Sequence, residues 1–306
     1  KDMLSAGAAI SVVGWWTGYK IGGLVSLISA DMLQKQGVEN YWQISFLILS
    51  GIIMLCSIGL FFIPEKNSKD KIKLQKLADQ EIIDKIGTSN NFIKIFAWLY
   101  STVINPLLSF FKKNTLGVAF SILGFIFLFK IGEAFLGRMS LVFYKEIGFS
   151  KTDIALYSKG IGWITTVTFT LLGGLFAVRM GLIKAMFLSG ILMALTNVMF
   201  SVLAWYGNSE FLFAFTVLID DLAAAFATVA FVGFISALVD RNYTATQYAL
   251  LASIGTAGRT LFASSSGMVV DWLNGDWIIF FIITALMVIP SLFCLFLIRK
   301  KINLNE

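Results

Sequence analysis

Eight ionisable side chains interrupt otherwise apolar stretches of this sequence. They are Lys20, Lys130, Glu133, Arg138, Lys159, Asp220, Asp221 and Arg259. A charged group in hydrocarbon costs several kcal/mol, so such residues face a bundle interior, pair with one another, or line a substrate or proton path. The sequence therefore predicts charge chemistry inside apolar helices, as ion pairing, anion binding or proton carriage.

Three of the cations fit an anionic ligand. Lys20, Lys130 and Arg259 fall close to the centres of their apolar segments, where snorkelling to the surface does not explain them. A guanidinium can also hold a carboxylate in a two-point fork. Gln247 and Tyr248 share the segment of Arg259 and complete the expected substrate-binding set. The alternative for Arg259 is an ion pair with an acid outside this sequence.

The acidic residues are the candidates for proton carriage. Glu133 lies three positions after Lys130, on the same helix face, so the two can pair; the pair either joins helices or is opened by substrate or a proton. Asp220 and Asp221 are adjacent. Burial and mutual repulsion favour protonation of at least one of them. Alternatively, they pair with a neighbouring basic residue.

The remaining cations lie nearer the ends of their segments. Arg138 and Lys159 are expected to reach the membrane interface. Over all these positions, basic residues outnumber acidic ones. Because unpaired buried charge is costly, an anionic ligand or further acidic residues must neutralise the excess.

Composition identifies the elements that hold these residues. The chain has 306 residues, of which 58% are apolar and 14% charged, whereas soluble domains are about a quarter charged. The expected fold is an all-α integral membrane bundle with eight transmembrane helices, each long enough to cross a bilayer. They are residues 4–30, 42–63, 116–143, 153–177, 183–206, 211–239, 245–270 and 276–298.

The same composition argues against an enzyme. Histidine, the commonest general base and metal ligand, is absent, and neither a zinc-protease motif nor a nucleophile elbow occurs. Cys56 and Cys294 lie in apolar runs and are expected to pack rather than bind metal. We expect no metal, no cofactor and no nucleic-acid partner; the expected partners are the lipid bilayer and an anionic small molecule.

Residues 64–115 form the long polar stretch between the second and third predicted spans. Its first part is rich in lysine, and its second part is apolar but interrupted by Pro106, which favours an interfacial helix. If this stretch is cytoplasmic, nearly all other loop lysines and arginines fall on the same side. The basic residues on the opposite side are Lys35, Lys145 and Lys151. The positive-inside rule then places both termini in the cytoplasm.

An internal repeat relates the first two predicted spans to the last two. In each, a small-residue helix carries a cation, Lys20 or Arg259, followed by Asp, a turn glycine and Trp. A parallel repeat of six spans with a long central loop is the plan of the major facilitator superfamily. On that plan the chain holds spans 5–12. Residues 1–63 end the N-terminal half, 64–115 are the linker, 116–306 form the C-terminal half, and four N-terminal spans are missing.

A loop motif supports this plan. The sequence GGLFAVRMGLIKAM joins two spans on the predicted cytoplasmic side and is similar to the superfamily's gating-loop signature of glycines and basic residues. The matching positions are Gly174, Arg179, Gly181 and Lys184. The acidic position of that signature falls on Val178, which weakens the expected ionic latch.

Several stretches resemble the AmpG-type muropeptide permeases of the major facilitator superfamily. They include FKIGEAF, GFSKTDIALYSKGIG and, most specifically, RNYTATQYALLASIGTAGR; acetyl-CoA transporters are more distantly similar. The resemblance implies proton-driven import of anhydro-muropeptides across a bacterial inner membrane, for cell-wall recycling. The alternatives are a truncated paralogue or part of a split carrier, which would need separately encoded N-terminal spans, and a carrier of another organic anion such as acetyl-CoA.

Overall fold

The computed structural model of the chain describes residues 2–62, 100, 104–150, 153–240 and 244–302. All regular structure in these ranges is helical. The helices are α1 (Asp2–Lys35), α2 (Tyr41–Leu60), α5 (Asn105–Lys113), α6 (Leu116–Leu128), α7 (Ile131–Glu146), η2 (Ile154–Ile161), α9 (Gly162–Met180), α10 (Leu182–Tyr206), α11 (Glu210–Leu238), α12 (Thr244–Ala263), α13 (Ser266–Trp272), α14 (Trp277–Leu286) and α15 (Ile289–Ile298).

Each of the eight segments predicted as a span is helical, but four of them change direction or winding midway. The segment 116–143 is α6 and α7, separated at Lys130, whose backbone leaves the α conformation (φ −103°, ψ 14°). The segment 153–177 opens with the π-helix η2 before α9, and 245–270 divides into α12 and α13. The last segment divides before Pro290, which occupies the first turn of α15.

Within the described ranges, six helical stretches are long and apolar enough to cross a membrane. They are Tyr41–Leu60, Leu116–Glu146, Leu156–Ala177, Leu182–Tyr206, Glu210–Leu238 and Trp277–Ile298. Helix α1 and the α12–α13 pair are not among them. Both contain many Gly, Ser and Thr residues and carry Lys20 and Arg259 respectively, which lowers their mean hydropathy.

Aromatic residues dominate the core of the C-terminal helices. Phe125 of α6 meets Phe234 of α11 edge-to-face, with ring centroids 5.2 Å apart. In a second cluster, Phe143 of α7 meets Phe281 of α14 at 4.8 Å. Such edge-to-face pairs add specific stabilisation to the burial of large apolar surfaces. These clusters fix α6, α7, α10, α11 and α14 around the polar residues described below.

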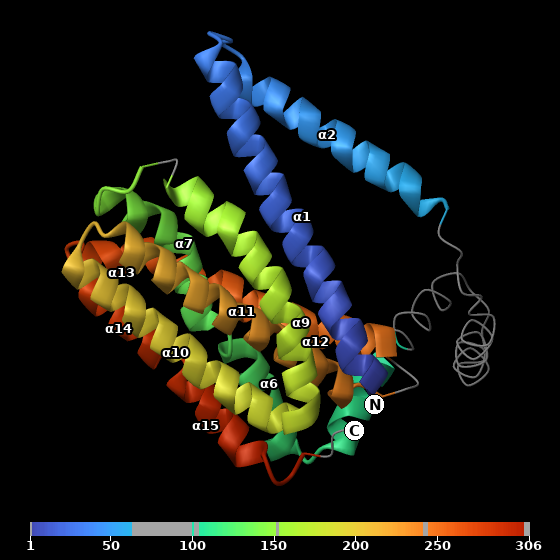
Figure 1. The fold of residues 1–306 in the computed structure, drawn as a ribbon. Coiled ribbons are helices and arrows are strands. Elements are labelled where there is room, and N and C mark those ends of the chain that lie inside the picture. The colour runs from blue at the N-terminus through green and yellow to red at the C-terminus, as the bar shows by residue number, and fades with distance from the viewer. Residues whose placement is uncertain (1, 63–99, 101–103, 151–152, 241–243, 303–306) are drawn as a thin grey trace.

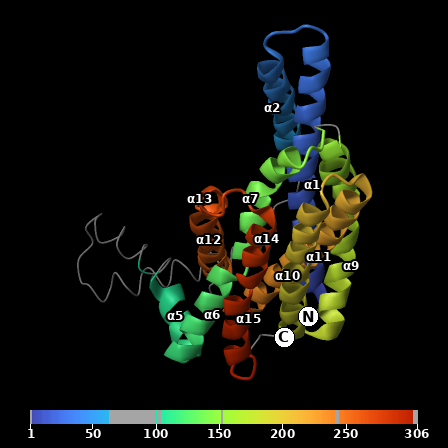
Figure 2. The same ribbon diagram turned by 90° about the vertical axis from the view of Figure 1, so that its left-hand side faces the viewer.

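Helices α1 and α2 form a hairpin that projects from the bundle (Figures 1 and 2). The lower part of α1 packs against α9, η2 and α11, whereas α2 packs on α1. Only 6% of the apolar window of α2 is buried. The hairpin is therefore attached to the bundle chiefly through one face of α1.

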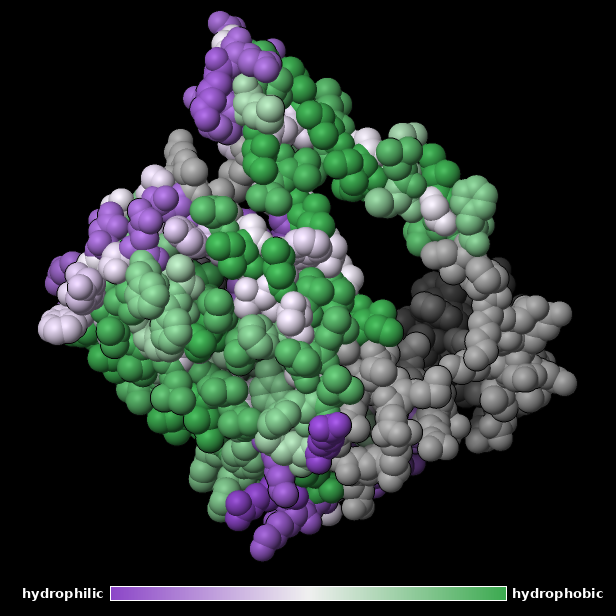
Figure 3. Space-filling model, viewed as in Figure 1, coloured by the Kyte–Doolittle hydropathy of each residue, from purple (hydrophilic) through white to green (hydrophobic). Residues whose placement is uncertain are grey.

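The two ends of the chain lie at the same end of the bundle as the α9–α10 turn (Figure 1). An apolar band covers the visible face, and hydrophilic residues gather above and below it (Figure 3). This distribution suits a protein that crosses a bilayer. It also agrees with the predicted grouping of the termini and the 178–184 loop on one side.

Most of the predicted interfacial helix within residues 64–115 lies outside the described ranges. Its last part is α5, which packs on α6 and α12. Pro106 lies in the first turn of α5, where a missing backbone N–H costs nothing, and both Pro106 and Phe110 are buried. Ile104, just before α5, is π-helical, so the winding changes next to Pro106.

Candidate functional site

Lys20 is the most enclosed cation of the described residues, although it belongs to the projecting hairpin. The residue is 4% exposed. Its ammonium donates to Asp221 Oδ1 of α11 at 2.7 Å and to two atoms of α9, Gly162 O and Thr166 Oγ1, both at 2.9 Å. All three ammonium donors are thus used, which is the condition for burying a charge at tolerable cost.

Gly162 makes room for this contact. A Cβ at this position would lie 2.5 Å from Asp221 Oδ2 and 2.9 Å from Lys20 Nζ. Gly162 also follows the π-helical turn η2, and its N–H bonds back to Tyr157 O in the π pattern. Such turns are rare and occur mostly at functional sites. Thr166 was not predicted from the sequence as a partner of Lys20.

A second ion pair lies at the break between α6 and α7. Lys130 Nζ is 2.9 Å from Glu133 Oε2 and donates to Thr228 Oγ1 of α11 at 2.7 Å. Lys130 is 8% exposed. The predicted pairing of Lys130 with Glu133 is confirmed, and the spacing of three residues was a sufficient signal for it. Thr228 adds the link to α11.

Asp220 lies between these two ion pairs. It accepts a hydrogen bond from Thr196 Oγ1 of α10 at 2.9 Å, and both Glu133 and Lys20 are near enough to act on its charge. The neighbouring Asp221 instead pairs with Lys20, as the alternative reading of the adjacent aspartates expected. Thr196 carried no signal in the sequence, because it lies on a different helix and is one of many buried threonines.

Lys159, in η2, completes a group of six charges. Its ammonium lies over the ring of Tyr19 of α1, 5.6 Å from the centroid, in cation–π geometry, and it is half-buried. Three lysines, Lys20, Lys130 and Lys159, therefore balance three acids, Glu133, Asp220 and Asp221. The predicted excess of positive charge falls on the two arginines, Arg138 and Arg259.

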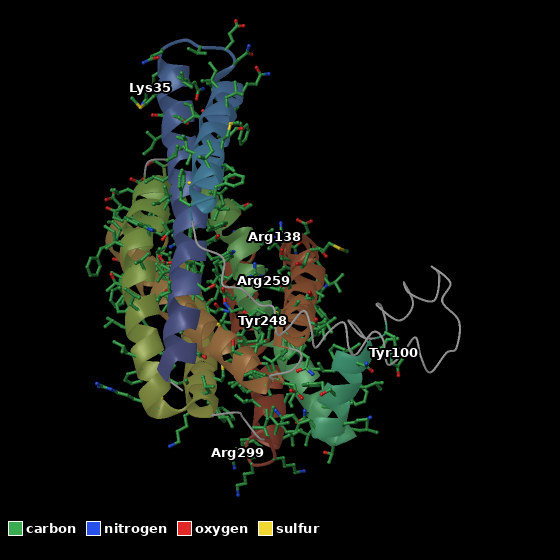
Figure 4. The ribbon with its side chains drawn as sticks, turned by 90° about the vertical axis from the view of Figure 1, so that its right-hand side faces the viewer. Lys35, Tyr100, Arg138, Tyr248, Arg259 and Arg299 are labelled. Carbon is green, nitrogen blue, oxygen red and sulfur yellow. The ribbon has the colours of Figure 1, made fainter. Side chains whose placement is uncertain are left out.

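Arg138, Arg259 and Tyr248 lie on one side of the bundle, between α1 and α12 (Figure 4). Arg259 is half-buried and Arg138 exposed. Among the ion pairs of the described residues, neither arginine takes part. An open space of about 570 Å³ lies against one face of α12, which is lined by small and hydroxyl-bearing residues from Ala249 to Thr260. Arg259 borders this face, three positions after Thr256.

Gln247 has a different environment. It is 3% exposed. Its Oε1 accepts from the backbone N–H of Asp240 at 2.6 Å, and its Nε2 donates to Pro106 O at 2.8 Å. The side chain thus ties α12 to α5 and to the segment that follows α11. We leave Gln247 out of the proposed ligand set for this reason.

The four residues of the gating-loop motif surround a tight turn between α9 and α10. Gly181 is the only residue between the two helices and has φ +85°, a conformation that favours glycine. Gly174 is buried, while Arg179 and Lys184 are exposed on either side of the turn. The motif thus forms a compact basic turn. This turn lies at the same end of the bundle as the two chain termini.

Comparison with known proteins places this arrangement in a family. Residues 2–263 match the Major Facilitator Superfamily. The AmpG 4 protein of Rickettsia conorii is 32% identical over 303 residues, covering 99% of this chain and 66% of that protein. The anhydromuropeptide permease of Escherichia coli K12 is 27% identical over 300 residues, covering 97% of this chain and 54% of the permease.

The AmpG 1 protein of Rickettsia prowazekii is 26% identical over 319 residues, covering 99% of this chain and 70% of that protein. The chain thus spans between about half and just over two thirds of the length of these relatives. Permease-named relatives and the apolar helices together support a multi-pass membrane protein. The chain belongs to the Major Facilitator Superfamily, and within that family its similarity is to AmpG-type permeases.

Proposed function

We propose that the complete gene product imports anhydro-muropeptides across a bacterial inner membrane, driven by protons. Two findings support this: the family, and the name of the Escherichia coli relative, an anhydromuropeptide permease. On this proposal the chain supplies eight membrane spans, with α1 and α12–α13 crossing the bilayer as well as the six most apolar stretches. Residues 1–63 end one half of the carrier and 116–306 form the other.

The observation that carries the proposal is the partly buried group of six charges around Asp220. Asp220 accepts one hydrogen bond, from Thr196, and lies near two ion pairs. A carboxylate in this position can take up a proton without a rearrangement of its helix, because Thr196 can still donate to the remaining oxygen. We therefore assign proton carriage first to Asp220, with Glu133 and Asp221 as acids already held by lysines.

The cations outside this balance are the proposed ligands for cargo. Muropeptides carry several carboxylates, and Arg259 offers a planar fork beside the open face of α12. Lys130 joins this set when a cargo carboxylate replaces Glu133, and Tyr248 lies on the same side of the bundle (Figure 4). Lys20 is excluded from direct cargo contact in the described conformation, since all its donors are in use.

The test is uptake by membrane vesicles that contain the complete gene product. Labelled anhydro-muropeptide should accumulate when an inward proton gradient is imposed. Asp220→Asn should abolish gradient-driven accumulation but keep exchange of labelled for unlabelled cargo, since the neutral amide carries no proton. Thr196→Val, which removes the hydrogen bond but not the acid, should slow accumulation without abolishing it.

Other outcomes would revise the proposal in different ways. Full accumulation by Asp220→Asn moves proton carriage to Glu133, Asp221 or residues outside this sequence. If acetyl-CoA or another organic anion accumulates and muropeptide is not taken up, the proposed cargo is wrong but the proposed proton coupling stands. Uptake that ignores the gradient removes proton coupling altogether.

A further inference from the structure

Two buried polar groups close to Asp220 have no hydrogen-bond partner among the described residues. They are the hydroxyl of Thr216, on α11, and the side-chain amide nitrogen of Asn197, on α10. Thr216 is 0% exposed and Asn197 is 2% exposed. A buried polar group without a partner costs free energy, and within a membrane bulk water cannot supply one. Such groups in proteins are commonly satisfied by an ordered water molecule.

Thr216 and Asn197 approach Asp220 from two directions. Thr216 lies four residues before Asp220, on the same face of α11. That face meets α10, because Thr196 Oγ1 donates to Asp220 Oδ1 at 2.9 Å. Asn197 follows Thr196 and points toward α7, where a Cβ on Gly132 would lie 3.3 Å from Asn197 Nδ2. Asn197 thus lies beside the first turn of α7.

Tyr144 brings a third polar group to the level of Thr216. It belongs to the last turn of α7, and its ring centroid lies 4.7 Å from that of Phe213 and 6.3 Å from that of Phe200. Phe213 is one turn from Thr216 on α11. Asp220 is near enough to interact electrostatically with the Tyr144 side chain. The polar groups of Tyr144, Thr216 and Asp220 therefore follow one another along α11.

From these positions we propose that Thr216 and Asn197 bind water molecules that connect Asp220 to the two ends of α7. One water accepts the hydrogen bond of the Thr216 hydroxyl and links Asp220 to the Tyr144 hydroxyl. The other accepts from Asn197 Nδ2 and links Asp220 to Glu133, which is near enough to act on its charge. Each water then has at least two polar protein groups around it, as buried waters require.

The two waters provide a route for a proton to and from Asp220. The water at Thr216 gives one proton to an Asp220 carboxylate oxygen and receives one from the Tyr144 hydroxyl, which is reprotonated from the end of α7. Only O–H bonds form and break in this step, and the helices stay in place. The proton route rests on the proposed function, whereas the two water sites do not.

Conservative substitutions remove the water-binding groups and keep the side-chain shape. Thr216→Val replaces the hydroxyl by a methyl group. Thr170→Val on α9 is the matched control, because Thr170 is also 0% exposed but its hydroxyl already donates to a backbone carbonyl of its own helix. Tyr144→Phe removes the tyrosine hydroxyl. Its control is Tyr157→Phe, since the Tyr157 ring also contacts Phe213, at 5.8 Å.

Infrared difference spectroscopy on the purified complete gene product detects the waters directly. Difference spectra between acidic and alkaline media are recorded in ordinary water and in water labelled with heavy oxygen, which shifts only the bands of water. We expect shifting water bands in the unchanged protein, weaker ones in Thr216→Val and Asn197→Leu, and none in Asp220→Asn. Thr170→Val should match the unchanged protein. An unchanged protein without such bands, or bands equally strong in Thr216→Val and Thr170→Val, overturns the water sites.

Uptake by vesicles tests the proton route separately. Thr216→Val and Tyr144→Phe should each slow gradient-driven accumulation of muropeptide about tenfold. Exchange of labelled for unlabelled cargo should stay unchanged, because it needs no net proton movement. Thr170→Val and Tyr157→Phe should match the unchanged protein in both measurements.

Three outcomes separate the route from the proposed function. Equal accumulation by Thr216→Val and Thr170→Val overturns the route. Loss of exchange together with accumulation in Thr216→Val assigns Thr216 a packing role, and this also overturns the route. If the complete gene product takes up no muropeptide, the proposed function fails, and the infrared bands still decide whether Thr216 and Asn197 bind water.

Discussion

Lys20 and Arg259 occupy matching positions in the predicted repeat but have different surroundings. Lys20 is enclosed and donates to three acceptors. Arg259 is half-buried, and the ion pairs of the described residues do not include it. The anion-binding role predicted for both cations thus fits Arg259 better than Lys20. Arg259 is the cation that is available for a ligand.

Arg259→Lys in the complete gene product should weaken uptake of an acidic cargo, and Arg259→Gln should weaken it further. The reason is geometric, since an ammonium cannot make the two parallel hydrogen bonds of a guanidinium. A charged hydrogen bond contributes on the order of 1.5–3 kcal/mol, so its loss should raise the apparent KM about ten- to hundredfold. Concentration-dependent uptake measures this directly.

A neutral cargo analogue separates cargo binding from structure in that experiment. Its uptake should fall less than that of the acidic cargo when Arg259 is changed. Arg138→Gln, at the exposed arginine on the same side of the bundle (Figure 4), is the matched control and should have a smaller effect. Equal losses for acidic and neutral cargo would assign Arg259 a structural role, such as counter-ion to an acid outside this sequence.

At the scale of elements, two helix breaks coincide with charged residues. The α6–α7 break places Lys130 at the start of α7 beside Thr228, and the π-helical turn ends at Gly162, where Lys20 binds. Sequence patterns predicted the helices but not these breaks, because apolar residues continue across them. The break before Pro290 had a visible cause. The others depend on packing between helices that are distant in sequence.

Gly258 sets the distance between α12 and α6. A Cβ at Gly258 would overlap the carbonyl oxygen of Phe127, which is backbone and cannot turn aside. Gly258→Ala should therefore force α12 away from α6 and destabilise the protein by about 1–3 kcal/mol. Gly267→Ala on α13, where no heavy atom lies within 4 Å, should be nearly neutral.

Thermal unfolding in detergent, followed by the loss of monodisperse protein, measures the difference between these two variants. The melting temperature of Gly258→Ala should lie clearly below that of Gly267→Ala. Similar melting temperatures would mean that α12 can shift without cost, and that the α6–α12 contact does not hold Arg259 in place.

At the scale of the whole molecule, local sequence patterns predicted the helices and short-range contacts well. Contacts between residues that are distant in sequence were not predicted. Length and hydropathy predicted a helix in each of the eight segments, and a spacing of three residues predicted the Lys130–Glu133 pair. The repeat predicted turn glycines at Gly37 and Gly275, which have φ of +79° and +78°. The contact of Lys20 with Asp221 spans 201 residues, and nothing in local spacing specifies such a partner.

The orientation of the whole molecule in the membrane stays a prediction, made from its lysines and arginines. The chain termini and the α9–α10 turn lie at one end of the bundle (Figure 1), and that end carries Arg179 and Lys184, whereas Lys145 lies at the end of α7. The positive-inside rule places the more basic end in the cytoplasm.

Two exposed lysines, Lys145 and Lys184, therefore provide a matched pair of reporters. In intact cells, and with Cys56 and Cys294 replaced, an impermeant thiol reagent should label Lys145→Cys and leave Lys184→Cys unlabelled. Permeabilised cells should show labelling of both, which establishes that each cysteine is accessible from its own side. The reverse pattern in intact cells would invert the molecule in the membrane. The proposed import direction would then have to be revised, because the basic turn around Gly181 would face outward.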